Sequence, residues 1–386
     1  MPKRNAQGAG TIRERKDGTW EARYTIGRDP GTGKQKQKSI YGKTQKEVLK
    51  KLQQVQNDVN TGAYIEPSKL TVGTWLDVWI KEYPGKTKER TRIEYKKHIE
   101  YRIKPALGNV QLTDLDTHTI QLFYNDCLRG SKGKKAIAPK TVRNIHGILH
   151  KALEQALELG YIRLNPSSRC KLPRVEKPDI NPLDDEQIKA FLLSIQGHQF
   201  EILNTVDLFT GIRQGEILGL PWSAINFKAG TILISQQLQR IDGEYKIVSV
   251  KNDKLRTITP APYVMRLLQQ QKTKQAADKL RAGSAWQNEH NLVFTNELGR
   301  NIARQTAYSN YKRLLKTANI EVHRFHDLRH SYAVAALQSG DDIKTVQENL
   351  GHYSAAFTLD VYGHVSDRMK KESAQRMEQF IQGVKG

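Results

Sequence analysis

Residues 323–330 read HRFHDLRH and place three histidines and two arginines within eight positions. On a helix, His326 precedes Arg329 by three residues and His330 by four, so all three side chains can share one face. Three interpretations fit this pattern. The two histidines have the H-x3-H spacing of a helical metal site. The octet can also cap a helix with structural histidines, or its guanidiniums can hold phosphate oxygens while an imidazole handles a proton.

The residues around the octet disfavour a metal. Arg329 would place a fixed cation among the ligands, no Glu follows His326, and the chain has no cysteine cluster to supply a third ligand. Cys127 and Cys170 lie far apart and form no CxxC pair, so we expect both to be ordinary reduced residues. The phosphate interpretation prevails over the structural one if other segments supply partners.

A first partner lies in residues 209–220, FTGIRQGEILGL. Arg213 follows a glycine at the start of an amphipathic pattern and stands three positions before Glu216. The carboxylate of Glu216 can hold the Arg213 guanidinium in one rotamer. The same spacing also fits an ordinary ion pair on a helix surface, which contributes little to stability.

A second partner lies in residues 250–258, VKNDKLRTI, within a stretch that reads as several strands. Lys251 stands at the expected rim of a hairpin. An ammonium is a movable point charge whose pKa falls when it is buried or crowded by other cations, so it can act as a general acid. Lys254 and Arg256 lie within five residues of Lys251 and could be mistaken for it.

A third partner lies in residues 349–365, NLGHYSAAFTLDVYGHV. This stretch supplies His352 and, ten residues later, Tyr362. A lone tyrosine is normally a packing residue. Beside several cations the phenolate form is favoured, and its oxygen becomes a nucleophile.

The charge of the whole chain points to a polyanionic partner. The 62 Lys and Arg residues exceed the 40 Asp and Glu residues, and the formal charge is +22. Nucleic acid is the simplest polyanion that fits. The first residues, MPKRNAQGAG, lack the apolar run of a secretory signal, and no stretch has the length of a membrane span. We therefore expect a cytoplasmic protein with no membrane partner.

The first segment reads as a small DNA-binding unit. Residues 11–15, 20–26 and 34–41 alternate like three short strands separated by turns. A helix should cover one face of this sheet through Val48, Leu52, Val55 and Val59. Residues 1–62 hold 14 Lys and Arg against 6 Asp and Glu, so we expect the uncovered face to meet DNA. The candidate contacts are Arg13, Arg15, Arg23, Lys36 and Lys38. A solvated polar sheet face is the alternative.

Two linkers divide the rest of the chain, and the first is TGAYIEPSKL, residues 61–70. Residues 144–160, NIHGILHKALEQALELG, place apolar side chains on one face and stop at Gly160, a typical helix end. Residues 170–182, CKLPRVEKPDINP, hold three prolines and read as an extended linker. The expected fold is multidomain α+β: a three-stranded sheet with a helix, a helical domain, and a mainly helical domain with a small sheet. Their expected bounds are 1–65, 70–170 and 180–386.

Taken in order, these stretches give the chain a resemblance to the tyrosine recombinase family, specifically the phage and conjugative-transposon integrases, over nearly its full length. TGIRQGE looks like the family's first arginine box, HDLRH like its H-x-x-R box, and LGH with YGH like its histidine and nucleophile boxes. Four boxes in the right order are far more specific than one. The resemblance implies an arm-type DNA-binding domain, a core-binding domain and a catalytic domain with a tail helix.

The resemblance also implies a nucleophile and its proton partners. Tyr362 would attack the scissile phosphate of DNA, forming a 3'-phosphotyrosyl link while a 5'-hydroxyl leaves. Lys251 would protonate the leaving oxygen. His326 would be the acid or base partner of the tyrosine.

The remaining family positions would hold the phosphate. Arg213 and Arg329 would bind its non-bridging oxygens and stabilise the charge that grows in the transition state. His352 would donate a hydrogen bond to it. Because these cations do the electrostatic work, the resemblance implies no divalent metal and no other cofactor. Each step exchanges one phosphodiester for another, so nucleotide hydrolysis is not required either.

The partners implied by the resemblance are double-stranded DNA at core-type and arm-type sites and a homotetramer that assembles on DNA. DNA-bending and excision accessory proteins are further candidates. The chain continues for 24 residues after Tyr362, with Met369, Ala374, Met377 and Phe380 at roughly helical spacing. In the family such a tail often docks on a neighbouring protomer, so we expect tail exchange.

Two other functions fit parts of the sequence. A type IB topoisomerase shares the catalytic residues, but the arm-like first segment and the tail argue against it. A DNA-binding regulator with a degenerate site would not be expected to keep all six catalytic positions. The sequence therefore favours site-specific recombination that integrates and excises a mobile element in a bacterial cell, where the protein would associate with the nucleoid when bound to DNA.

Overall fold

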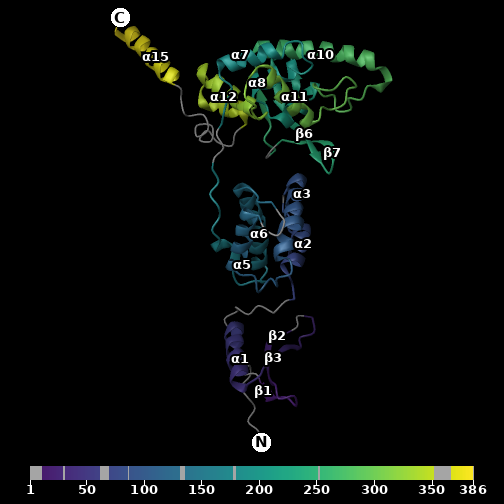
Figure 1. Cartoon of the computed structure of the whole chain (residues 1–386), viewed down its shortest axis with the longest axis vertical. Coiled ribbons are helices and arrows are strands. Elements are labelled where there is room, and N and C mark those ends of the chain that lie inside the picture. Colours follow the sequence, from purple (N-terminus) through teal and green to yellow (C-terminus); the bar gives the residue numbers. More distant parts are fainter. Residues whose placement is uncertain are drawn as a thin grey trace. The chain divides into compact units, whose positions relative to one another are not determined.

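The computed structural model describes residues 11–28, 31–60, 69–85, 87–130, 135–176, 180–250, 253–351 and 367–385, without the side chains of 58, 60 and 367–373. Three predicted catalytic residues, Lys251, His352 and Tyr362, lie outside the described residues. The chain divides into two compact units, Met1–Glu176 and Lys177–Gly386 (Figure 1). No helix in the described ranges is long and apolar enough to cross a membrane.

The first unit begins with the predicted three-stranded sheet. Strands β1 (Thr11–Glu14), β2 (Trp20–Arg28) and β3 (Gln35–Gly42) pair antiparallel in that order. Helix α1 (Gln45–Asn60) lies along one face of the sheet (Figure 1). Val48 and Leu52 of the helix pack against Ala22 and Tyr24 of β2, and all four are buried. The sheet and its covering helix are confirmed.

The other face of this sheet centres on a buried carboxylate. Directly paired residues point to the same side of a sheet, and the register pairs Glu21 with Arg13 and Arg23 with Ser39. Glu21 is 3% exposed and accepts bonds from the Ser39 hydroxyl (2.7 Å), from Arg13 Nη2 (2.6 Å) and from Arg23 Nε (3.0 Å). The hydrogen bonds of Ser39, Arg13 and Arg23 lower the pKa of Glu21 to about 2. One buried anion thus organises two arginines on the uncovered face.

The five cations predicted to meet DNA do not all share that face. Arg15 does, because its guanidinium carbon lies 5.3 Å from the ring centroid of Tyr41, which pairs with Glu21. Lys38 pairs with Tyr24, a residue of the helix-covered face, and Lys36 lies two positions away on the same side. The expectation of a single face is therefore wrong for Lys36 and Lys38, because the register of β3 turns them to the other side. Their contact with DNA stays a prediction.

Helices make up the rest of the first unit. They are α2 (Val72–Glu82), α3 (Glu89–His98), the π-helical η1 (Ile99–Ile103), α4 (Lys104–Leu107), α5 (Thr117–Arg129), α6 (Pro139–Glu158) and the short 3-10 turn η2 (Pro166–Arg169). The buried face of α6 includes Ile145, Ile148 and Leu153, as its sequence predicts. Gly160 then adopts φ 73° and Tyr161 donates back to the Ala156 carbonyl at 2.8 Å, which ends the helix.

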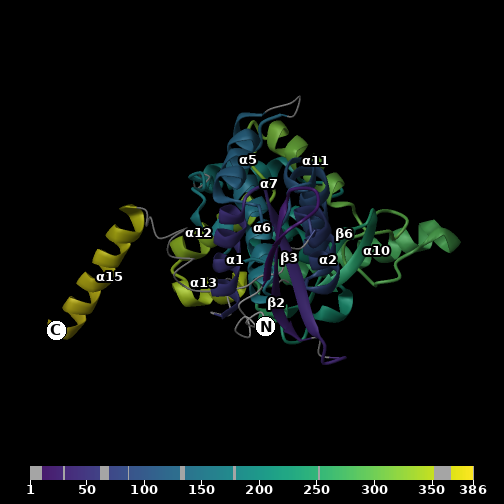
Figure 2. The ribbon, with the colours of Figure 1, turned by 90° about the horizontal axis from the view of Figure 1, so that it is seen from below.

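The second unit combines helices with two small sheets. Its helices are α7 (Asp185–Ser194), α8 (Glu201–Thr210), α9 (Gln214–Leu218), α10 (Pro262–Ala282), α11 (Arg304–Thr317), α12 (Asp327–Gln338), α13 (Ile343–Leu350) and α15 (Asp367–Lys385), with 3-10 turns η3 (Trp222–Ala224) and η5 (Gly283–Ala285). Its strands are β4 (Ile225–Asn226), β5 (Thr231–Ile234), β6 (Gln236–Ile241), β7 (Glu244–Ser249) and β8 (Arg256–Ile258). Helix α12 contacts both α8 and α13, and Figure 2 shows α12 and α13 side by side. The predicted mix of helices with a small sheet is confirmed.

The strand pairing changes the expected setting of Lys251. Strand β7 pairs with β6, whereas β8 pairs with β5 in the other sheet. The connection that holds Lys251 therefore joins two sheets, and the expected hairpin between its flanking strands is wrong. The position stays adjacent to β8, which begins five residues later with Arg256.

The tail forms the helix expected after residue 366. Its apolar side chains are exposed within the unit, with Met377 at 58%, Phe380 at 67% and Val384 at 70%. These residues recur at three- and four-residue spacing, so they form one apolar stripe.

Candidate active site

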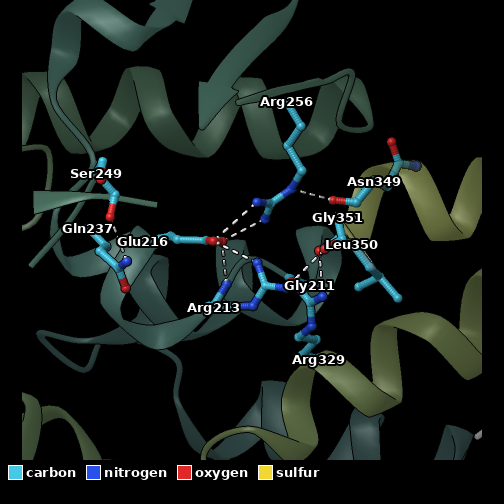
Figure 3. A network of polar contacts seen from close by, with 10 residues as sticks. All are labelled: Gly211, Arg213, Glu216, Gln237, Ser249, Arg256, Arg329, Asn349, Leu350 and Gly351. Atoms are coloured by element: carbon cyan, nitrogen blue, oxygen red, sulfur yellow. Dashed lines mark hydrogen bonds and ion pairs between the residues drawn. The ribbon is translucent and has the colours of Figure 1, made fainter. Parts of the chain in front are cut away.

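Three arginines surround the C-terminal end of α13 (Figure 3). Each donates a hydrogen bond to one of three successive main-chain carbonyls: Arg256 Nε to Asn349, Arg329 Nη2 to Leu350 and Arg213 Nη2 to Gly351. The last carbonyls of a helix lack partners within it, and they carry the negative end of the helix dipole. Three cations from distant segments thus converge on one negative pole.

Glycine allows the helix to end there. Gly351 adopts φ 63° and ψ 45°, the left-handed conformation that residues with a Cβ rarely take. An added Cβ would stand 3.0 Å from Cδ of Arg256. The turn therefore depends on glycine for both its backbone and its close contact with the arginine. His352, a predicted catalytic residue, follows immediately in sequence.

Arg213 stands at the start of α9, where it pairs with Glu216. Arg213 Nη1 donates to Glu216 Oε1 at 2.8 Å, and the main-chain N–H of Arg213 donates to Glu216 Oε2 at 3.1 Å. Glu216 is only 1% exposed, whereas the Arg213 side chain is 29% exposed. The surface ion pair that the spacing also allowed is excluded, because the carboxylate is buried.

A second arginine shares this carboxylate. Arg256 Nη1 and Nη2 donate to the two oxygens of Glu216 at 3.1 and 2.6 Å. Burial alone would raise the pKa of Glu216, but the hydrogen bond and charge of Arg256, together with Arg213, outweigh it and lower the pKa to about 2. Glu216 is therefore ionised at neutral pH and holds both guanidiniums.

Arg329 is the most deeply placed of the three arginines. It is 1% exposed, and its Nη1 donates to the carbonyl of Gly211 at 2.7 Å in addition to the bond with Leu350. Gly211 ends α8 with φ 60°, and a Cβ there would come within 2.5 Å of the Tyr332 ring. The guanidinium is thus fixed between two helix ends, α8 and α13.

The octet that contains Arg329 spans the start of α12. Asp327, the first residue of that helix, is 3% exposed and accepts from the main-chain N–H of Arg324 at 2.8 Å and from its Nη2 at 2.9 Å. Phe325 is buried and stacks edge-on against Tyr311 with 5.2 Å between ring centroids. Arg324 and Phe325 thus anchor the turn that presents His326.

The two histidines of the octet face each other. The rings of His326 and His330 lie edge to face with centroids 5.0 Å apart. His326 is exposed to solvent overall, yet partial desolvation of its ring, followed by the charges of His330, Arg329 and Arg213, lowers its pKa to about 4. The imidazole is therefore neutral at pH 7 and can accept a proton. Within the described ranges no group of three or more His, Cys, Asp or Glu side chains could hold a metal ion.

The structure therefore brings together three of the six predicted catalytic residues, Arg213, His326 and Arg329. It also reveals partners that sequence reasoning missed. Asp207 on α8 is fully buried near Arg329 and Glu216, and burial raises its pKa well above the ordinary value. Its Oδ1 accepts no hydrogen bond in the described structure. The sequence signal is an acidic residue with apolar neighbours on both sides, Val206 and Leu208.

Comparison with known protein families gives two matches. A model described as "Phage integrase family" matches residues 183–369, and one described as "Phage integrase, N-terminal SAM-like domain" matches residues 71–128. The chain is 29% identical over 378 residues to a protein named tyrosine recombinase XerC-like from Caldanaerobacter subterraneus subsp. tengcongensis. That alignment covers 92% of this chain and 95% of the relative.

Solved structures share the fold. A Tn1549 transposon integrase in complex with transposon right end DNA is 21% identical, with a TM-score of 0.67, covering 80% of this chain and 99% of that one. A lambda integrase tetramer bound to a Holliday junction is 18% identical, with a TM-score of 0.54, covering 92% of this chain and 96% of that one. The likeness extends through most of each chain.

Proposed function

The chain belongs to the phage integrase family of tyrosine recombinases, and from that premise we propose how its own residues cut and rejoin DNA. It is a site-specific recombinase of the integrase type. Its reaction would proceed through a 3'-phosphotyrosyl intermediate and would integrate and excise a mobile element.

In the proposed reaction, the Tyr362 hydroxyl oxygen attacks the phosphorus of the scissile phosphodiester. The new bond joins this oxygen to phosphorus, and the bond from phosphorus to the 5' oxygen breaks. His326, neutral before the reaction, accepts the tyrosine proton, and Lys251 gives a proton to the departing 5' oxygen. Attack by a 5'-hydroxyl of the partner strand reverses these steps and releases Tyr362.

Arg213 and Arg329 would stabilise the charge on the non-bridging oxygens, and His352 would add a hydrogen bond. In the free protein both arginines donate to carbonyls at the end of α13. A bound phosphate would replace some of these acceptors with its own oxygens, which carry a full charge and form stronger bonds. The phosphate site is thus prepared in advance, with few side-chain rotations left to fix when DNA binds.

One observation carries the residue assignment. Arg213, in the segment before α9, donates at 3.1 Å to the carbonyl of Gly351, 138 residues further along the chain. Gly351 directly precedes His352, and Arg329 binds the carbonyl one residue earlier. Three sequence boxes with no local reason to meet are therefore joined by direct contacts.

We extend the proposal to the domains. Residues 1–65 would bind arm-type sites, residues 70–170 core-type sites, and residues 180–386 would carry the chemistry. The supporting features are the two separate hydrophobic cores of the first unit and the basic face around Glu21.

The partners would be double-stranded DNA and three further copies of the chain. A lambda integrase with the same fold has been solved as a tetramer on a Holliday junction. The exposed apolar stripe of α15 would dock on a neighbouring protomer in this assembly. DNA-bending and excision proteins would assist, and the reaction would take place in the cytoplasm, where bacterial DNA lies. Neither a metal nor another cofactor is required in this scheme.

The test uses a duplex with a nick beside the scissile phosphate of a candidate core site. The fragment released by cleavage diffuses away, so a covalent protein–DNA product accumulates and is seen on a denaturing gel. The full-length protein and Tyr353→Phe should form it, whereas Tyr362→Phe should not. Tyr353 is a matched control because it lies in the same stretch of sequence.

Three outcomes would contradict the proposal. A covalent product with Tyr362→Phe would exclude this nucleophile, and the absence of a product with every variant would favour a DNA-binding regulator. Relaxation of supercoiled DNA without any joining of two sites would instead favour a topoisomerase.

A further inference from the structure

We propose that Arg256 is a positioning residue of the recombinase active site, fixing the Arg213 guanidinium for the scissile phosphate by holding both Glu216 and the end of α13. This inference rests on the proposed function, because it assigns Arg213 to the phosphate. The six catalytic positions inferred from the sequence do not include Arg256.

The contacts of Arg256 use three edges of its guanidinium. Nη1 and Nη2 bind the two oxygens of Glu216 at 3.1 and 2.6 Å, and Nε binds the carbonyl of Asn349 at 2.8 Å. The side chain is only 8% exposed. Arg256 thus joins α9 to α13 through a buried fork (Figure 3).

The carboxylate of Glu216 transmits this fixation to Arg213. Its two oxygens accept four described hydrogen bonds, two from Arg256 and two from Arg213. A carboxylate offers about four acceptor positions, so this one is saturated. Without Arg256, half of these positions would be vacant in a buried site, and the carboxylate could rotate. The Arg213 side chain, being 29% exposed, would then lose its fixed direction.

The backbone of Arg256 is itself rigidly held. Arg256 begins β8 and pairs with Ile234 of β5, which is 1% exposed. Strand β8 also contacts α13. The sheet therefore supplies a fixed reference against which the arginine orients two other segments.

The same contacts exclude a proton-donating role for Arg256. A guanidinium stays charged at every pH at which proteins fold, so it cannot act as a general acid. All three nitrogens of this guanidinium already donate hydrogen bonds, to the two oxygens of Glu216 and to the carbonyl of Asn349. The ambiguity between Lys251 and Arg256 is resolved for the arginine: its effect on catalysis has to pass through Glu216 and Arg213.

The experiment compares Arg256→Gln and Arg256→Lys with Arg213→Ala in the full-length protein. The nicked substrate is made with either a normal scissile phosphate or a methylphosphonate, whose methyl group replaces one non-bridging oxygen and removes the charge. Arg240→Gln is the matched control, because Arg240 is exposed on β6 and donates to Gly243 within its own hairpin. Single-turnover cleavage, DNA affinity and thermal unfolding are measured for each protein.

On the normal phosphate, Arg256→Gln should cleave about 10- to 100-fold more slowly than the unaltered protein, with DNA affinity nearly unchanged. Arg256→Lys keeps the positive charge but not the forked guanidinium. Its cleavage rate should lie between those of Arg256→Gln and the unaltered protein. On the methylphosphonate, the cleavage rates of Arg213→Ala and Arg256→Gln should fall much less below that of the unaltered protein, because there is less charge for Arg213 to stabilise. Adding Arg256→Gln to Arg213→Ala should cause little further loss. Arg240→Gln should behave like the unaltered protein.

Three results would overturn the inference. One is cleavage by Arg256→Gln at the unaltered rate, another is an equal fold-loss on both substrates, and the third is independent, multiplying losses in the double variant. If Arg256→Gln does not fold, the same comparisons of cleavage rate on the two substrates, and in combination with Arg213→Ala, are made with Arg256→Lys. A covalent product from the unaltered protein shows that the proposed function holds, so these results would then count against Arg256 alone.

Discussion

Nη2 of Arg213 donates a hydrogen bond of 3.1 Å to the main-chain oxygen of Gly351, although 138 residues separate them. The acceptor belongs to a helix end, where the main chain carries partial negative charge. The guanidinium that we propose for the phosphate thus binds a main-chain oxygen of its own chain in the free protein. The following predictions depend on this arrangement.

Gly211→Ala should destabilise the second unit by about 2 kcal/mol or more, because φ 60° is strained for alanine and its Cβ would meet Tyr332 and Leu350. Gly197→Ala is a matched control, since Gly197 has φ 71° but nothing within 4 Å of the added Cβ. Urea unfolding measures both. Equal decreases in the free energy of unfolding would mean that Tyr332 and Leu350 can move away from the added Cβ without further destabilising the protein.

The stability of the second unit should fall in acid because of Glu216. Its pKa is lowered from 4.5 to about 2, so its contribution is fully present above pH 4.5 and is lost as the pH falls toward 2. The contribution is of the order of 3 kcal/mol. Unfolding free energies between pH 2 and 6 should show a steeper fall for the unaltered protein than for Glu216→Gln. Glu348→Gln, on the exposed side of α13, should keep the steep fall.

His326 should titrate well below pH 6.5 in the free protein, since desolvation and the charges of His330, Arg329 and Arg213 lower its pKa to about 4. A bound phosphate would neutralise those positive charges, so the pKa should rise in a complex of Tyr362→Phe with its core site. NMR titration of labelled imidazoles, assigned with His326→Gln, measures both states. An equally high pKa of His326 with and without DNA would contradict its assignment as the acceptor of the tyrosine proton.

Arg13→Gln should weaken binding to an arm-type site and reduce the slope of log affinity against log salt by about 1. The reason is that Glu21 holds Arg13 on the uncovered face of the first sheet. Lys51→Gln is the control, because Lys51 lies on α1, where it pairs with Glu47 at 2.7 Å. Equal changes in the two slopes would show that the face does not matter.

Deletion of residues 366–386 should leave cleavage nearly unchanged and abolish strand exchange, because the stripe on α15 would no longer reach a neighbouring protomer. Phe380→Glu should have the same effect, whereas Gln379→Glu adds the same charge to the same helix beside the stripe and should not. Gel assays of cleavage and of joined products separate the two steps. Recombination at the normal level after the deletion would show that strand exchange does not require the tail.

Local sequence patterns predicted the individual elements well. Alternation and turn residues gave the three strands before residue 42, and the buried stripe of α6 followed from Ile145, Ile148 and Leu153. These features depend on neighbours within a few residues, so a single chain segment contains the information. The fold class followed from their order, and the structural likeness to integrases confirms it.

Contacts between distant segments were beyond such patterns. In the sequence, Arg256 could be mistaken for the predicted catalytic residue Lys251. In the structure it binds Glu216, 40 residues earlier, and Asn349, 93 residues later. The turned face of Lys38 had the same origin, because strand register depends on the partner strand as well as on alternation. Packing decides these relationships, and no local spacing encodes them.

The end of α13 also solves a problem of mutual repulsion. Arg213, Arg256 and Arg329 meet at three adjacent carbonyls, and three positive groups so close together would normally drive each other apart. The helix terminus acts as a built-in counter-ion, together with the ionised Glu216. The three arginines therefore need no sulfate or phosphate ion from solution to stay together in the absence of DNA. Dilute low-salt buffer should not separate them.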